Sequence, residues 1–206
     1  MDNKKIEFLA KAATTYMQFG FKSVTMDEMA RQLGMSKKTI YTFVKDKADL
    51  INQCLELSQD MERCDITEIA KKHDNAIDEL LAIGELVSTR LRSMHPSIFF
   101  DLIKYYPAVI QKFKQHKDTF VKQSVVDNLE KGMKQGLYRD NLDSQIISKM
   151  YLSFIDVLFQ GDTFPYSEYT FTQVYSEYFR YHIRGIASDN GLKHLQEVLT
   201  NNNFNI

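Results

Sequence analysis

The side chains best suited to contacting a charged polymer lie close together near the N-terminus, in the stretch SKKTIYTFVK. Lysine ammonium groups attract phosphate, while threonine and tyrosine hydroxyls donate and accept hydrogen bonds. On a short helix beginning after Ser36, five residues would be exposed: Lys37, Lys38, Thr39, Tyr41 and Thr42. Such a helix is typical of proteins that place one helix end in the major groove of DNA. An ordinary helical corner with a solvated basic face is the alternative interpretation.

Two short helices joined by a tight turn are expected to position this stretch. Thr25 is a good N-cap and Glu28 follows three residues later, which fits a reciprocal capping box. Gly34 comes directly after the apolar stripe of the first helix, where a left-handed residue commonly ends a helix. The turn of about three residues makes the helices cross steeply, as in a helix-turn-helix.

The second helix is predicted to begin at Ser36, whose hydroxyl can cap it. Ile40 would fill the angle between the two helices, and either Phe43 or Val44 would be the next inward residue. The small side chain of Ala30 would let the second helix approach the first.

The segment SKKTIYTFVKDKADL resembles the recognition helix and following residues of the TetR-type (tetracycline-repressor family) transcriptional regulators. The matching positions are Ser36, Thr39, Ile40, Tyr41, Lys47 and Leu50. Two residues depart from the commonest pattern of that family. Lys38 stands where glycine is frequent and adds a cation on the DNA side, and Val44 stands where phenylalanine is frequent. The neighbouring Phe43 can partly replace the aromatic contact.

The resemblance implies an all-α fold with a helix-turn-helix DNA-binding domain at residues 1–45 and a helical ligand-binding and dimerisation domain at 46–206. We expect the major groove to be entered or flanked by Lys37, Lys38, Thr39 and Tyr41, and phosphates to be held by Thr25, Thr42 and Lys47. The partner would be a palindromic double-stranded operator. The chain would be a repressor released by a small molecule, although the ligand, the operator and the sign of regulation cannot be derived from the sequence.

Composition and charge agree with this interpretation. The 206 residues include only 3 prolines and 8 glycines, which favours helices. The formal net charge is −1, yet five cations lie between Arg31 and Lys47 against one acidic residue, Asp46. A basic N-terminal segment on an acidic body supports a local contact with DNA rather than a globally basic protein.

Apolar periodicity predicts a helical body. A long helix over residues 47–72 follows an N-cap at Asp46, and another begins near Asp74, a plausible cap. Further helices cover SIFFDLIKYY, residues 107–134, 144–160 and 167–187. Gly136 is expected to end one of these helices and Asp143 to cap the next. The helices at 144–160 and 167–187 carry apolar residues over a broad arc, so we assign them to a homodimer interface; the alternative is that both faces are internal core.

The resemblance also implies a small-molecule site inside the body. The candidate residues are Arg90, His95, Phe99, Tyr105, Phe113 and His116, which combine polar groups with aromatic surfaces. Most of these aromatic side chains are expected simply to pack the core. A ligand that prefers the conformation with misplaced DNA-binding heads would release DNA by a population shift.

Other function classes find little support in the sequence. No phosphate-binding glycine loop, nucleophile elbow or HExxH motif is present, so neither an enzyme nor a cofactor is expected, and no metal site is assigned. Cys54 and Cys64 are expected to be reduced thiols in a cytoplasmic protein without membrane spans, although a redox-sensing role stays open. A helical protein-interaction adaptor without DNA binding is the alternative function.

Overall fold

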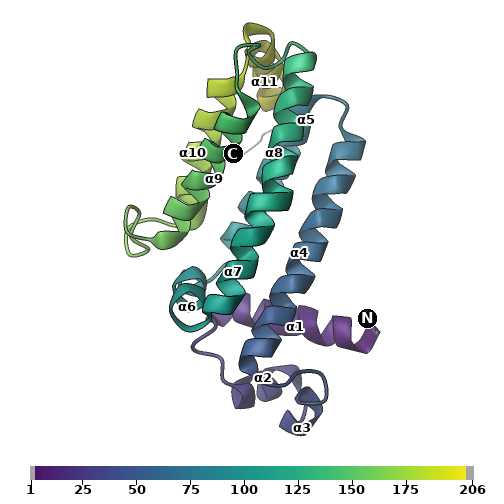
Figure 1. Ribbon diagram of the computed structural model, residues 1–206, viewed down its shortest axis with the longest axis vertical. Helices are drawn as coiled ribbons and strands as arrows, with labels where there is room; N and C mark the ends of the chain where they lie inside the picture. Colours follow the sequence, from purple (N-terminus) through teal and green to yellow (C-terminus); the bar gives the residue numbers. More distant parts are fainter. Residues whose placement is uncertain (1–2, 203–206) are drawn as a thin grey trace. The chain divides into compact units, whose positions relative to one another are not determined.

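The computed structural model describes residues 3–202, and this part of the chain folds almost entirely into helices, as predicted (Figure 1). The elements are α1 (Asn3–Phe19), α2 (Met26–Leu33), α3 (Lys37–Ile40), α4 (Lys47–Lys72), α5 (Ala76–Arg92), α6 (Ile98–Tyr105), α7 (Pro107–His116), the π-helix η1 (Lys117–Val121), α8 (Lys122–Lys134), α9 (Ser144–Gln160), α10 (Phe171–Ile186) and α11 (Asp189–Asn202). An isolated antiparallel bridge pairs Tyr138 with Ala187.

The chain packs into two compact units that divide α4. The first unit contains Met1–Cys64 and Ser93–His116, and the second contains Asp65–Arg92 and Lys117–Ile206. Packing therefore groups α6 and α7 with the N-terminal helices. These units do not test the predicted domain boundary between residues 45 and 46, which stays a prediction.

The core of the first unit holds the short helices in place. Ile40 is fully buried and Val44 is 3% exposed, so Val44 is the inward residue after Ile40. Phe43 is half-buried and stacks on Phe8 of α1, with ring centroids 5.1 Å apart. The aromatic ring at position 43 thus fastens the end of the helix-turn-helix to α1.

The start of α6 lies against the end of α1 within the same unit. Gly20 has φ +80°, and a Cβ there would approach Ser97 Oγ to 2.6 Å. The His95 amide donates to Met17 O at 2.7 Å, and the Lys22 amide donates to Asp101 Oδ2 at 2.8 Å. These bonds tie the loop that leads into α2 to α6.

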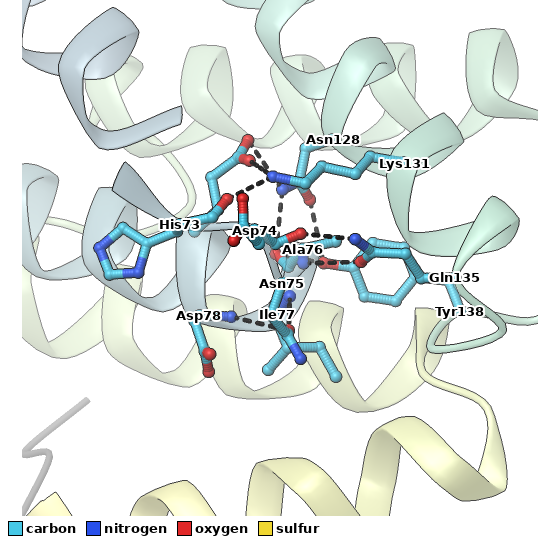
Figure 2. Close-up of polar contacts among 11 residues, drawn as sticks. His73, Asp74, Asn75, Ala76, Ile77, Asp78, Asn128, Lys131, Gln135 and Tyr138 are labelled. Atoms are coloured by element: carbon cyan, nitrogen blue, oxygen red, sulfur yellow. Dashed lines mark hydrogen bonds and ion pairs between the residues drawn. The ribbon is translucent and has the colours of Figure 1, made fainter. Parts of the chain in front are cut away.

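In the second unit, α5 packs against α8 and α10, and α9 packs against α8 and α10. A polar cluster fixes the connection between α4 and α5 onto α8 (Figure 2). Lys131 Nζ donates to His73 O at 2.5 Å and to Glu79 Oε2 at 2.7 Å. Asn128 Nδ2 donates to Glu79 Oε1 and to Ala76 O, both at 3.0 Å. Glu79 is only 5% exposed, so its charge depends on these partners.

Two of the predicted helix ends agree with the structure, and one predicted cap does not. Gly136 (φ +69°) follows the end of α8, and Asp143 caps α9 by accepting from the amides of Gln145 and Ile146, as predicted. The predicted cap of α5 was wrong: Asn75, not Asp74, accepts from the Ile77 amide at 2.8 Å.

Two further helix predictions needed correction. The helix predicted at 167–187 begins only at Phe171, because Thr170 and Gln173 form a complete capping box. The helix predicted at 107–134 is interrupted by η1, whose π turn changes the direction of the side chains that follow.

Candidate nucleic-acid interface

The N-terminus of α2 is capped by Thr25, as the sequence predicted. Thr25 Oγ1 accepts from the Glu28 amide at 3.1 Å, and Thr25 itself is extended, with φ −75° and ψ 168°. The Glu28 carboxylate, however, accepts from Arg31 Nη2 at 2.6 Å and from Gln32 Nε2 at 3.0 Å. Only the Thr25 half of the reciprocal capping box is therefore recorded in the described residues.

Gly34 makes the corner between α2 and α3. It has φ +62° and ψ 29°, and its amide faces the carbonyls of Ala30 and Arg31 at the end of α2. A Cβ built on Gly34 would meet nothing within 4 Å. The requirement for glycine is therefore conformational rather than steric.

α3 is a single turn held by Ser36. Ser36 Oγ accepts from the Thr39 amide at 3.0 Å and lies 2.7 Å from Thr39 Oγ1. Residues 41–43 continue as turns, and Thr42 Oγ1 donates to Thr39 O at 2.6 Å. The outward residues of this segment, Lys37, Lys38, Thr39, Tyr41 and Thr42, are all exposed.

Two of the cations counted in the sequence are paired with acidic side chains of α2. Lys37 Nζ lies 3.0 Å from Asp27 Oδ2, and Arg31 Nη2 lies 2.6 Å from Glu28 Oε1. The hydrogen bond from Lys37 to Asp27 raises the pKa of Lys37, so this ammonium stays charged. Asp27 and Glu28 stand just outside the basic stretch, which is why the charge count overestimated the unpaired positive charge.

Lys47 lies in the first turn of α4, where Asp46 Oδ1 caps the Asp49 amide at 2.8 Å. Its Nζ donates to Lys22 O at 3.5 Å, and its side chain is half-buried. Burial lowers the pKa of Lys47, partly offset by the charge of Asp101. A phosphate beside Lys47 would restore the favourable surroundings of the charged form.

The arrangement presents one aromatic hydroxyl, two threonine hydroxyls and two lysines on the outside of a rigid corner. These groups match the donors that contact phosphate oxygens and base edges in duplex DNA. The hydroxyls of Thr39 and Thr42 make local bonds, so contact with DNA would exchange or share those bonds.

The six predicted ligand residues divide between the two units: five belong to the first unit and Arg90 belongs to the second. Phe99 and Phe113 meet edge to face with centroids 5.2 Å apart, and His116 Nε2 lies 2.8 Å from Glu62 Oε2, all in the first unit. Arg90 belongs to the second unit, where its Nη2 donates to Asp65 at 2.7 Å.

The other two ligand candidates also lie in the first unit. His95 Nδ1 lies 3.0 Å from Ser97 Oγ. Tyr105 is 40% exposed, with the ammonium groups of Lys22 and Lys104 over its ring.

An apolar surface that the sequence associated with dimerisation lies on α9 and α10, which run side by side in the second unit (Figure 1). Ile146 and Met150 on α9 are 57% and 63% exposed, and Tyr181 on α10 is 80% exposed. Tyr178 and His182, one on each side of Tyr181 along α10, are half-buried. We call Ile146, Met150 and Tyr181 the α9–α10 apolar face.

Neither a metal site nor a membrane segment is found in the part of the chain that the structure describes. Residues 3–202 contain no group of three or more His, Cys, Asp or Glu placed to hold a metal ion. No helix there is long and apolar enough to cross a bilayer. Cys54 is buried and donates to Leu9 O, and Cys64 is exposed.

The region that contains the helix-turn-helix matches a known protein-family model. Residues 8–54 match the family model described as bacterial regulatory proteins, tetR family. The chain is 26% identical over 167 residues to YhgD of Bacillus subtilis strain 168, described as an uncharacterised HTH-type transcriptional regulator. That alignment covers 75% of this chain and 83% of YhgD.

Solved structures show the same fold. A TetR-family transcriptional regulator from Agrobacterium tumefaciens matches with a TM-score of 0.72 and 13% identity, over 90% of this chain and 98% of that protein. A transcriptional regulator from Saccharomonospora viridis, solved in complex with choline, matches with a TM-score of 0.66 and 17% identity, over 98% of both chains.

Sequence reasoning missed several polar contacts that involve buried residues. Lys117 is 6% exposed, and its Nζ bonds both carboxylate oxygens of Asp156 at 2.5 Å. Tyr138 is 1% exposed and donates to Ala76 O at 3.1 Å. No local pattern identifies such pairs, since the partners are 39 and 62 residues apart.

Proposed function

Because the chain is a TetR-family transcriptional regulator, we propose that it binds a palindromic operator as a homodimer and represses transcription until a small molecule releases it. The observation that carries the DNA-binding part is the rigid corner of capped helices. Thr25 and Ser36 fix the starts of α2 and α3, and Gly34 fixes the turn between them. The exposed side chains on that corner are the groups that read and hold duplex DNA.

Two kinds of contact are proposed within the interface. Lys37, Lys38, Thr39 and Tyr41 would enter or flank the major groove, and Thr25, Thr42 and Lys47 would hold phosphates. Phosphate contacts position a protein on every sequence alike, whereas contacts to base edges specify the sequence. The two roles therefore predict different mutant behaviour.

Lys47→Ala and Lys38→Ala separate these roles. Lys47→Ala is expected to weaken binding to all DNA sequences similarly. It should also reduce the slope of log K against log salt concentration by about one unit. Lys38→Ala is expected to relax the base preference at one operator position and to reduce the free energy of binding to the operator by about 1–3 kcal/mol. Fluorescence anisotropy on the operator and on single-base variants, at several salt concentrations, measures both effects. Equal losses for both variants on every sequence would contradict the assignment of roles.

The homodimer proposal draws support from the α9–α10 apolar face. Reading two half-sites one helical turn apart requires a two-fold symmetric protein, and a dimer interface is the same patch on both copies. Ile146 and Met150 lie one turn apart on α9, and Tyr181 is exposed on the neighbouring helix α10; large exposed apolar side chains of this kind are what such an interface covers.

The ligand-release proposal draws support from the resemblance and from the neighbour solved with choline. A ligand that binds more tightly to the conformation unable to hold DNA shifts the population away from the DNA-bound state. The ligand-binding roles of Arg90, His95, Phe99, Tyr105, Phe113 and His116 remain proposals.

The first experiment is a titration of the purified full chain against genomic fragments, including DNA that flanks its own gene. Wild type and Tyr41→Ala are compared at two salt concentrations. Tight binding of wild type to a near-palindromic site, lost in Tyr41→Ala, would support the regulator. The absence of any selective binding, repeated with cell extract added, would favour a helical adaptor that binds protein instead.

A further inference from the structure

Two lysines outside the helix-turn-helix converge on one exposed tyrosine of α6. Lys22 Nζ lies 5.4 Å from the centroid of the Tyr105 ring, and Lys104 Nζ lies 5.5 Å from the same centroid. Lys104 Nζ also lies 5.2 Å from the centroid of the Phe100 ring. A side-chain hydrogen bond with Lys22 is the largest cause of the lowered pKa of Tyr105, and the positive charge of Lys104 adds to it. Both ammonium groups are therefore held at one aromatic side chain.

The positive charge of this pair is not neutralised by an acidic side chain. Among residues 3–202, no carboxylate forms an ion pair with Lys22 or Lys104, whereas Lys37 is paired with Asp27. Asp101 of α6 is only 2% exposed, and its carboxylate accepts from the Lys22 amide rather than from the ammonium group. An aromatic ring attracts a cation without cancelling its charge, and each lysine has three N–H donors. Both lysines can therefore still bind an anion.

The two lysines are connected to the residues that we propose to hold phosphates. Lys47 Nζ donates to Lys22 O at 3.5 Å, and the Lys22 amide donates to Asp101 Oδ2 at 2.8 Å. The loop between α1 and α2 thus joins the start of α4 to α6 within the first unit (Figure 1). Thr25 follows Lys22 by three residues, and a chain extends by at most about 3.5 Å per residue, so their Cα atoms lie within about 10 Å.

The backbone of duplex DNA is the partner that fits this surface. A DNA strand presents one phosphate for about every 3.4 Å along the helix axis. A duplex held at Thr25 and Lys47 therefore brings further phosphates to the neighbourhood of Lys22. The side chains of Lys22, Lys104 and Tyr105 are exposed and offer N–H and O–H donors, which are the groups that bind phosphate oxygens.

We propose that Lys22, Lys104 and Tyr105 form a second phosphate-binding surface, the α6 cationic surface, which binds the operator backbone beside the helix-turn-helix. Lys22 and Lys104 donate to phosphate oxygens, and Tyr105 positions both ammonium groups through its ring and its hydroxyl. The proposal rests on the proposed function, to which it adds a DNA contact from α6, a helix outside the residues 8–54 that match the family model.

A scan of the operator backbone tests the contact on the full chain. The near-palindromic site from the genomic titration is synthesised as a set of duplexes, each with one phosphate of each half-site replaced by an uncharged methylphosphonate. Fluorescence anisotropy gives the affinity of wild type, Lys22→Gln and Lys104→Gln for each duplex. At the phosphates bound by the α6 cationic surface, the replacement is expected to weaken wild-type binding about three- to fivefold, the size of an exposed ion pair.

The two lysine variants are expected to show the matching loss. Each should bind the unmodified duplex about three- to fivefold more weakly than wild type, and methylphosphonate at its own phosphate should cost it nothing further. A duplex of scrambled sequence should lose the same factor, because phosphate contacts carry no sequence information. The thermal midpoints should match that of wild type, because both side chains are exposed.

Two further variants separate position from charge. Lys114→Gln removes the same charge from an exposed site on α7 of the same unit, and it is expected to keep the wild-type response at every phosphate. Tyr105→Leu removes the ring and the hydroxyl but no charge. It is expected to weaken the response at the phosphates of Lys22 and Lys104 and nowhere else.

Several results would overturn the proposal. One is a scan in which each methylphosphonate costs the lysine variants as much as it costs wild type, because the lysines would then act only through the overall charge. Another is unchanged affinity in both lysine variants, or an equal loss in Lys114→Gln. If wild type selects no operator, the proposed function fails together with this contact. Operator binding that is insensitive to Lys22→Gln and Lys104→Gln contradicts only the α6 cationic surface.

Discussion

Gly34 illustrates how one residue sets the geometry of the proposed DNA-binding surface. Its φ of +62° costs a residue with a Cβ about 1 kcal/mol, although nothing lies within 4 Å to clash with that atom. Gly34→Ala is therefore expected to lower the free energy of unfolding by about 1 kcal/mol, and Gly34→Asn by clearly less, because asparagine tolerates this conformation. Urea unfolding measures both values, and equal losses would contradict the conformational explanation.

At the scale of elements, the polar cluster on α8 fixes the start of α5. Lys131→Met would leave the Glu79 carboxylate buried without its cation, so we expect a loss of about 3 kcal/mol at neutral pH. Lys71→Met is the control, because Lys71 and Glu68 form an exposed pair whose removal changes stability by less than about 1 kcal/mol. Similar losses for both variants, measured by urea unfolding, would contradict a buried ion pair.

The helix bounds also show how much of the fold could be predicted from the sequence. Strong local signals were interpreted correctly: the Thr25 and Ser36 caps, Gly34, and the bounds of α4 from 47 to 72. The error at the start of α5 arose because Asp74 and Asn75 are adjacent residues that can both cap a helix, and the sequence alone does not decide between them. The π-helix η1 was not predicted, because apolar periodicity assumes a constant helical repeat along the chain. The contacts of Lys117 and Tyr138 depend on chain folding and have no signature in sequence.

For the whole molecule, stability is expected to depend on pH through His182. Burial against the rings of Tyr151 and Tyr178 lowers the pKa of His182 to about 4, from 6.5. Above pH 6.5 both states hold the neutral ring. Between about pH 6.5 and 4 the unfolded chain binds a proton that the folded chain does not, so stability falls by about 3 kcal/mol as the pH drops.

His182→Phe keeps an aromatic ring at this position and removes the titrating group. The difference in unfolding free energy between wild type and His182→Phe, followed by urea titrations from pH 7.5 to about 4, isolates the contribution of this residue from that of the carboxylates. A difference that stays constant over this range would contradict the lowered pKa.

Assembly is the second property of the whole molecule that can be tested. Met150→Glu places a charge in the α9–α10 apolar face, at a side chain that is 63% exposed in the single chain. The variant is expected to fold normally but to sediment as a monomer and to bind a two-half-site operator much more weakly. Met61→Glu on α4, at a position 54% exposed, makes the same change on a helix that the proposed interface does not include and is expected to leave the dimer intact. A dimeric Met150→Glu would place the interface elsewhere.

The ion pair between Lys37 and Asp27 has a consequence for selectivity. In the proposed interface, a phosphate that contacts Lys37 would have to compete with the Asp27 carboxylate, whose Oδ2 lies 3.0 Å from the ammonium nitrogen. Loose encounters with arbitrary DNA gain little from displacing it, since one anion merely replaces another. A well-fitted operator, which engages Lys37 together with its neighbours, gains more. If Lys37 contacts DNA as proposed, Asp27 would lower the binding of arbitrary DNA more than the binding of the operator.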